Sequence, residues 1–191
     1  MTIRTNHYEV AFEAFLRQQK IPYIAVDERR RALLGSGSLK NLDFIASPSG
    51  GEMSWLIDIK GRKFPSGRRN RYWKNWTTTD DLHSLSQWQR LLGPQFRGLL
   101  VFAYEVVGDM APVPDRQLFV HQERLYAFIG VRLDLYLAWA RKISPRWKTM
   151  AMPTKAFRQL AEPVQVTLQT PIVSGGDFDQ RRISDTMPAI A

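Results

Sequence analysis

The sequence predicts an α/β protein in which an opening helix packs on one central sheet. Three observations support this fold class: an amphipathic pattern at the start, short apolar runs with strand periodicity in the middle, and a long apolar run after a second amphipathic segment. The predicted order is helix, three strands, helix and strand, followed by further elements. This order differs from the strand–helix alternation of a doubly wound nucleotide-binding fold.

Composition narrows the class of protein further. The 191 residues suffice for one domain with a proper core, and 44% apolar with 24% charged residues is typical of a globular protein. No apolar run is long enough for a membrane span, the N-terminus lacks the apolar region of a secretory signal, and cysteine is absent. We therefore expect a cytoplasmic protein without a membrane partner. The net charge of +9 favours an anionic partner, with nucleic acid foremost.

The first half of the chain predicts one helix and three strands. Residues 6–20 carry apolar side chains at helical spacing, with Asn6 as N-cap and Pro22 beyond the end. The elements expected next are a strand at 23–28, a polar glycine-punctuated connection at 29–38, strands at 40–46 and 53–62, and a basic loop at 63–76.

The second half predicts a helix, a buried strand and several shorter elements. Residues 77–93 have capping residues, acids in the first turn and a closing glycine, which indicates a helix. Residues 97–107 form a β-branched and aromatic run typical of a central strand. The elements expected after it are a hairpin at 116–132, a helix at 133–143, a strand at 147–153 and a helix at 154–161. We expect a single domain over 1–161 and a largely irregular tail over 162–191, where Pro, Gly, Ser and Gln dominate.

Two aspartates and a lysine interrupt the strand candidates. Because strand side chains alternate between faces, Asp58 and Lys60 share one face while Ile57 and Ile59 share the other. With Asp43 on the neighbouring strand, two carboxylates and one ammonium would converge. Such oxygen ligands suit Mg²⁺, although a cross-strand ion pair would explain Asp58 and Lys60 without a metal.

The opening helix offers a third carboxylate. Glu9 lies at the edge of the apolar stripe and could face the sheet, and Glu13 lies one turn later. Both could instead lie on a solvated flank, with Glu13 and Arg17 as an i, i+4 ion pair.

Glu9 on a helix, Asp43 on a strand and Asp58-Ile59-Lys60 on the next strand resemble the PD-(D/E)XK nuclease superfamily over residues 7–107. The opening helix also resembles that of Holliday-junction-resolvase-like members. His7–Glu13, which reads HYEVAFE, is similar to the motif of the HYExAFE family. The sequence departs from the superfamily pattern because Leu42, and not proline, precedes Asp43.

The resemblance implies a restriction-endonuclease-like core, with a mixed central sheet flanked by helices. It implies that Asp43, Asp58 and the Ile59 carbonyl hold Mg²⁺ or Mn²⁺, with support from Glu9, and that Lys60 assists the attacking water. Many members place a Gln or Lys on the following helix, for which Gln87 is the candidate.

The expected function is metal-dependent hydrolysis of nucleic acid, DNA rather than RNA. The related nucleases are often dimers, so a homodimer is one assembly that the resemblance allows. Two alternatives remain open: a nuclease-like fold that binds nucleic acid without cutting it, and a structural protein in which the same charges form a buried ion-pair network.

The segment from Lys60 to Trp76 adds a candidate nucleic-acid interface. Seven of its seventeen residues are Lys or Arg, none is acidic, and four aromatic residues are interleaved. Cations neutralise phosphates and aromatic faces stack on bases. The residues expected to contact nucleic acid are Arg62, Lys63, Arg68, Arg69, Arg71, Tyr72 and Lys74. The alternative is a solvated loop whose Trp73 and Trp76 pack into the core.

Overall fold

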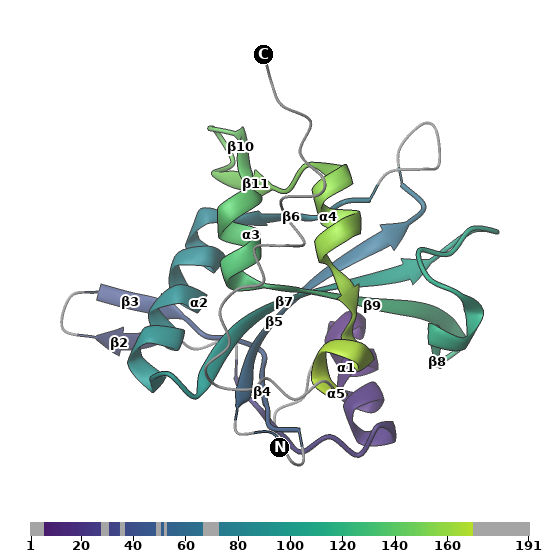
Figure 1. Ribbon diagram of the computed structural model, residues 1–191, viewed down its shortest axis with the longest axis horizontal. Helices are drawn as coiled ribbons and strands as arrows, with labels where there is room; N and C mark the ends of the chain where they lie inside the picture. Colours follow the sequence, from purple (N-terminus) through teal and green to yellow (C-terminus); the bar gives the residue numbers. More distant parts are fainter. Residues whose placement is uncertain are drawn as a thin grey trace, which may run out of the picture.

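The structure is a computed structural model that describes residues 6–27, 31–34, 37–48, 51, 53–66 and 73–169. Within these ranges a curled mixed sheet forms the centre, with helices packed against it (Figure 1). The described part of the sheet has seven strands in the order β1-β4-β5-β7-β9-β12, and β8 pairs with β9. The predicted fold class, an α/β protein with a mixed central sheet flanked by helices, is confirmed.

The strands of the central sheet are β1 (Tyr23–Ala25), β4 (Phe44–Ala46), β5 (Ser54–Phe64), β7 (Phe96–Val106), β8 (Phe119–His121), β9 (Arg124–Arg132) and β12 (Glu162–Pro163). Strands β5 and β7 pair in parallel, and the other described pairs of this sheet are antiparallel. A parallel pair needs a crossover connection, which contains the helix α2. The helices are α1 (His7–Gln18), α2 (Thr79–Leu92), α3 (Leu133–Trp139), α4 (Thr154–Leu160), α5 (Val164–Gln169) and the short 3-10 helix η1 (Asp115–Gln117).

Two small sheets flank the main one. Strands β2 (Arg31–Leu34) and β3 (Gly37–Lys40) form a hairpin. Strands β10 (Arg141–Ser144), β11 (Thr149–Ala151) and β6 (Trp76–Thr78) form an antiparallel sheet next to the start of α2.

Alternation along β5 separates two cores, as the sequence predicts. Trp55, Ile57 and Ile59 lie in the core that α1 and α5 cover. Leu56 and Phe64 lie in the opposite core, under α2, α3 and α4. Asp58 and Lys60 therefore belong to the face of the sheet that α2 covers.

The helix α1 follows from its pattern and its cap. Asn6 is the N-cap, and its side-chain oxygen accepts a hydrogen bond from the Tyr8 N–H at 3.2 Å. Phe12, Phe15 and Leu16 are buried against the sheet, which confirms the predicted helix. Tyr8 lies directly over Gly61 of β5, so this glycine permits a close approach that brings the start of α1 to the sheet.

The structure differs from the predicted elements around Lys40. Residues 29–38 were expected to be a connection, but the described part of this segment belongs to the β2–β3 hairpin, in which backbone groups pair across the two strands. The strand expected at 40–46 is divided: β3 ends at Lys40 and β4 begins at Phe44. Asp43 lies in the bend between them, because its side chain and its N–H both bond to β5.

The C-terminal part also differs. The helix expected at 133–143 ends at Trp139, because Arg141–Ser144 pair with β11 instead. Glu162–Gln169, predicted to begin an irregular tail, form β12 and α5, since Val164 and Leu168 are buried in the core under α1. Residues 170–191 lie outside the described residues, so the division into domain and tail stays a prediction. No helix among the described residues is long and apolar enough to span a membrane.

We expect Gly61→Ala to destabilise the fold, because a Cβ at this position would lie 2.1 Å from Cδ2 of the Tyr8 ring. Overpacking of this kind lowers the free energy of unfolding by about 1–3 kcal/mol, measurable by urea denaturation. Gly108→Ala is the matched control, since its Cβ would meet Pro65 at 3.4 Å. In a Tyr8→Ala background the same glycine substitution should be less damaging. Equal losses in both backgrounds would show that the ring contact is not the cause.

Candidate active site

Asp43 is fixed at the edge of β5 where β4 begins. Its N–H donates to the Ile57 carbonyl at 2.9 Å, and its Oδ2 accepts from the Ile59 N–H at 2.6 Å. The side chain therefore continues the ladder beyond the end of β4. Because the N–H and C=O of one strand residue point to the same side, the Ile59 carbonyl faces this edge as well. Asp43 is 3% exposed.

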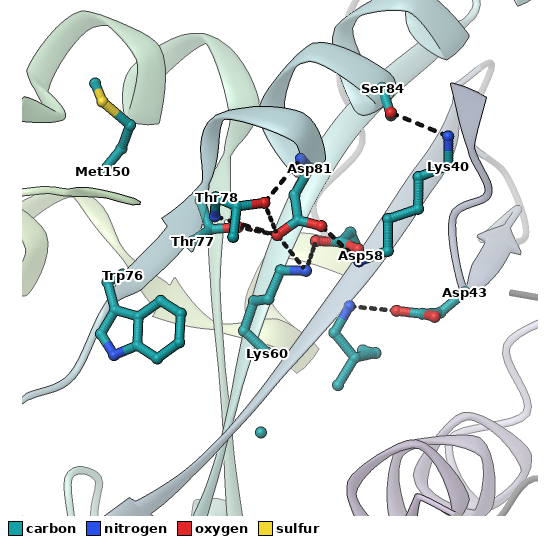
Figure 2. A network of polar contacts seen from close by, with 12 residues as sticks. Lys40, Asp43, Asp58, Lys60, Trp76, Thr77, Thr78, Asp81, Ser84 and Met150 are labelled. Carbon is teal, nitrogen blue, oxygen red and sulfur yellow. Dashed lines mark hydrogen bonds and ion pairs between the residues drawn. The ribbon is translucent and has the colours of Figure 1, made fainter. Parts of the chain in front are cut away.

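Lys60 joins two carboxylates on the α2 side of the sheet. Its Nζ lies 2.7 Å from Asp58 Oδ2 and 3.1 Å from Asp81 Oδ2 (Figure 2). The Lys60 side chain is only 11% exposed, and both carboxylates are buried more deeply. Asp58 and Lys60 are thus same-face neighbours, as alternation predicts, but they share their ion pair with a residue of α2.

Asp81 is the member of this group that sequence reasoning did not identify. It is the third residue of α2 and forms a capping box with Thr78, in which Thr78 Oγ1 accepts from the Asp81 N–H and the Thr78 N–H donates to Asp81 Oδ2, both at 3.1 Å. Its Oδ1 binds Lys40 Nζ at 2.6 Å, and Thr77 Oγ1 donates to its Oδ2 at 3.0 Å. An acid in the first turn indicates a cap, and that local role hides the long-range one.

Three residues of α2 hold Lys40: Asp81 binds its side chain, and two others bind its backbone. Its backbone N–H donates to Ser84 Oγ at 3.1 Å, and its carbonyl accepts from the Trp88 indole at 3.0 Å. The face of α2 toward the site therefore carries Asp81, Ser84 and Trp88.

The carboxylates have opposite electrostatic environments. Burial, followed by the charges of Asp58 and Glu9, raises the pKa of Asp43 well above its usual range. Burial also raises the pKa of Asp58, although Lys60 partly offsets this. The pKa of Asp81 is lowered, because Lys60 and Lys40 together outweigh its burial.

Lys60 is a firmly held cation. Burial, the largest single effect, lowers its pKa, but the charges of Asp58 and Asp81 more than compensate, so the pKa lies above its usual value. Lys60 therefore stays protonated at neutral pH and acts as a donor of hydrogen bonds and charge.

Glu9 faces inward from α1 and is 2% exposed. The Asn6 amide donates to Glu9 Oε1, which ties this carboxylate to the helix cap. Its charge raises the pKa of Asp43. Glu13, by contrast, pairs with Arg17 and accepts from the Tyr23 hydroxyl, both at 2.8 Å, so the predicted i, i+4 pair is confirmed.

Asp43, Asp58 and the Ile59 carbonyl are the groups that could hold a magnesium or manganese ion. Among the described residues, no group of three or more His, Cys, Asp and Glu lies close enough together to hold a metal. Mg²⁺ needs only one or two protein carboxylates, because waters and substrate phosphates complete its shell. Asp43 and the Ile59 carbonyl lie on one edge of β5 beside Asp58, and the raised pKa of Asp43 marks a place where added positive charge would be stabilised.

The described side-chain hydrogen bond of Gln87 lies within α2. Its amide oxygen accepts from Arg90 at 2.5 Å on an exposed part of α2. The residue of α2 that contacts Lys60 is Asp81. A catalytic role for Gln87 stays a prediction that these contacts do not support.

The basic segment is described only in part. Arg68, Arg69, Arg71 and Tyr72 lie outside the described residues. Lys63 is exposed and Lys74 is half-buried, whereas the Arg62 guanidinium lies 4.0 Å from the centre of the Trp76 ring and donates to the Trp76 carbonyl.

Trp73, named above as a residue that could pack into the core, does so. Its ring lies 5.5 Å from that of Phe64 and 5.8 Å from that of Tyr104. The three described cations of the basic segment have different environments: Lys63 is exposed, Lys74 is half-buried, and Arg62 packs on Trp76.

Comparison with protein-family models finds no match, and comparison with curated proteins finds none either. Among solved structures, a Holliday junction resolvase, Hjc, from the archaeal hyperthermophile Archaeoglobus fulgidus is similar at a TM-score of 0.48 and 12% identity. The alignment covers 85% of this chain and 98% of the resolvase. Membership of the HYExAFE family stays a prediction.

Asp43→Asn and Asp81→Asn should change stability in opposite directions at neutral pH in the presence of EDTA. Asn at position 43 removes a disfavoured buried charge and keeps an acceptor for the Ile59 N–H, so we expect a gain of about 1 kcal/mol, or roughly 2–4 °C in Tm. Asn at position 81 leaves the buried Lys60 and the partly exposed Lys40 with one fewer counter-charge, so we expect a loss of about 3–5 kcal/mol.

The pH dependence separates the two cases further. The folded-state pKa of Asp43 lies above its unfolded value, so wild type loses stability relative to Asp43→Asn as the pH rises through the folded pKa. The folded-state pKa of Asp81 is depressed, so the stability it contributes is lost as the pH falls toward that pKa. Thermal denaturation over a pH series measures both. Similar destabilisation by both substitutions would indicate a purely structural ion-pair network.

Proposed function

We propose that the protein is a metal-dependent nuclease that hydrolyses phosphodiester bonds, of DNA rather than RNA. The observation that carries this proposal is the arrangement of Asp43 and Asp58 around the Ile59 segment, with Lys60 held beside them. Buried carboxylates with raised pKa values next to a fixed cation are typical of functional sites.

Asp43, Asp58 and the Ile59 carbonyl are the groups that would hold Mg²⁺ or Mn²⁺, with Glu9 supporting from α1. Such an ion supplies positive charge to a phosphate and a water of lowered pKa. The chain itself fixes Asp43 through the Ile59 N–H and keeps Glu9 in place through Asn6, so neither carboxylate has to reorganise when substrate arrives.

Lys60 would stabilise the charge that develops on the phosphate and orient the attacking water by donating a hydrogen bond. It would not remove a proton from that water, because Asp58 and Asp81 keep its ammonium protonated. Asp81 is a positioning residue in this proposal, since it binds Lys60 without lying on the Asp43 edge of β5.

The high positive charge supports nucleic acid as the substrate, and the candidate contacts are Arg62, Lys63, Arg68, Arg69, Arg71, Tyr72 and Lys74. A cytoplasmic location and a homodimer complete the proposal.

The ion-pair network favours a second candidate, a chain that binds nucleic acid without cutting it. Lys60 is shared between two carboxylates and is largely buried, which restricts its access to a substrate. Salt-sensitive binding that needs no metal and survives Asp58→Asn would identify this function.

Asp58→Asn should reduce Mn²⁺-supported cleavage by at least about 100-fold, because the site loses a charge that orients both Lys60 and the metal. Single-turnover kinetics on labelled DNA and RNA measures the effect. Asp134→Asn is the matched control, since Asp134 is exposed and pairs with Arg132 on the surface. If wild type cuts neither substrate with Mg²⁺ or Mn²⁺, the nuclease proposal fails.

Mn²⁺ affinity measured by calorimetry should rise with pH over the range in which Asp43 and Asp58 lose their protons. The cation and the proton compete for Asp43 and Asp58, whose pKa values are raised by burial. Asp43→Asn should abolish this binding while the protein stays folded. An affinity that does not change with pH, or that survives the substitution, would place the metal elsewhere.

A further inference from the structure

The hairpin of β10 and β11 carries an exposed basic patch around one tryptophan. We call Arg141, Lys142, Arg146, Trp147 and Lys148 the hairpin patch. All five are exposed, and none of the ion pairs among the described residues involves its four cations. Trp147 is 69% exposed, with the Arg146 guanidinium 5.3 Å from the centre of its ring.

The hairpin patch is fixed next to the candidate active site. Strand β11 pairs with β6, which runs directly into α2 (Figure 1). The Thr79 N–H donates to the Lys148 carbonyl at 2.8 Å. The buried Asn75 exchanges two hydrogen bonds of 3.1 Å with the Met152 backbone. These contacts hold the hairpin against the crossover between β5 and β7.

A cavity of about 410 Å³ lies between the hairpin patch and the candidate site, and residues of both line it. The residues that line it are Lys40, Thr78, Thr79, Asp80, Asp81, Trp147 and Lys148. Since Asp81 also binds Lys60 at 3.1 Å, the cavity adjoins the proposed catalytic group.

Side chains, and not the end of α2, provide the binding groups of this cavity. The N–H groups of Thr79 and Asp81 already bond to the Lys148 carbonyl and to Thr78 Oγ1. The other side chains are the exposed Trp147 indole and Lys148, the Asp80 and Asp81 carboxylates, and Lys40, whose ammonium binds Asp81. An aromatic face next to cations suits a nucleobase and its phosphate.

We propose that the hairpin patch and this cavity bind a single-stranded segment of nucleic acid, with one base stacked on Trp147 and its flanking phosphates on Arg146 and Lys148. The base must be unpaired, because a base within a duplex does not present its face to a side chain. Because the cavity adjoins Lys60, the bound segment would lie next to the phosphodiester bond that is cut. That last step rests on the proposed nuclease function, whereas binding by the hairpin patch does not.

Fluorescence anisotropy with labelled oligonucleotides in EDTA tests the stacking. Trp147→Ala should weaken binding of a single-stranded oligonucleotide by about 5- to 100-fold, whereas Trp147→Phe, which keeps an aromatic face, should retain most of the affinity. DNA and RNA oligonucleotides of one sequence identify which sugar is preferred. Tighter binding of a blunt duplex, unaffected by Trp147→Ala, would overturn the proposal.

A matched pair of double variants tests the phosphate contacts. In a plot of log K against log[salt], the double variant Arg146→Gln with Lys148→Gln should have a slope smaller in magnitude by about 1.4. This corresponds to about 0.7 for each lost phosphate contact. Lys20→Gln with Arg116→Gln removes the same charge from the end of α1 and from η1, and should leave the slope unchanged. Equal reductions in both double variants would reject the hairpin patch as the binding surface. Thermal denaturation confirms that every variant is folded.

The two proposals can fail separately. If wild type cuts nucleic acid but Trp147→Ala binds as tightly as wild type, the inference is wrong and the nuclease function stands. If no divalent metal supports cutting but the hairpin variants lose binding, the nuclease function is wrong and the inference stands. An acidic peptide that competes for the patch more strongly than an oligonucleotide would reject the inference in favour of a protein partner.

Discussion

The ion pairs of Lys60 with Asp58 and Asp81 are the interaction on which the site depends. They join the middle of β5 to the first turn of α2, and Lys40 extends them to β3 (Figure 2). Removing charges from water is unfavourable unless they are paired and hydrogen-bonded. Asp81 meets this requirement with two lysines and two threonines, so the crossover helix has a fixed position above the strand that carries Asp58.

The same network explains why identical side chains behave differently. Asp81 is surrounded by cations, and its pKa is lowered. Burial, followed by the charges of Asp58 and Glu9, raises the pKa of Asp43, although this carboxylate accepts a hydrogen bond from the Ile59 N–H. Lys60 pairs with Asp58 and Asp81 on the α2 side of the sheet, whereas Asp43 accepts a hydrogen bond from the Ile59 N–H on the β4 side of β5. In the proposed function, a divalent cation at Asp43 would supply positive charge on this side of β5, in addition to that of the Lys60 pairs on the α2 side.

Sequence periodicity predicted the side chains whose positions depend only on their own strand or helix. The two-residue repeat of β5 placed Asp58 with Lys60, and the stripe of α1 placed Glu9 near the sheet. Asp81 escaped prediction because a capping box explains an acid at that position completely, whereas its contacts with Lys40 and Lys60 depend on tertiary packing. Gln87 was chosen by resemblance; its amide oxygen accepts a hydrogen bond from Arg90 of the same helix, and its catalytic role stays a prediction.

The small sheet of β6, β11 and β10 brings part of the chain after β9 next to the candidate site. Its strands come from positions 76–78 and 141–151, and β6 precedes α2 without a break. A side chain on the hairpin therefore lies next to Asp81 although about 65 residues separate them, as Trp147 does in the shared cavity. Because Asn75 and the β6–β11 ladder fix this geometry, the hairpin can present its cations without first becoming ordered. A flexible single strand loses conformational entropy when it binds. A protein surface that is already ordered adds no second entropy cost of this kind, so preorganisation favours the association.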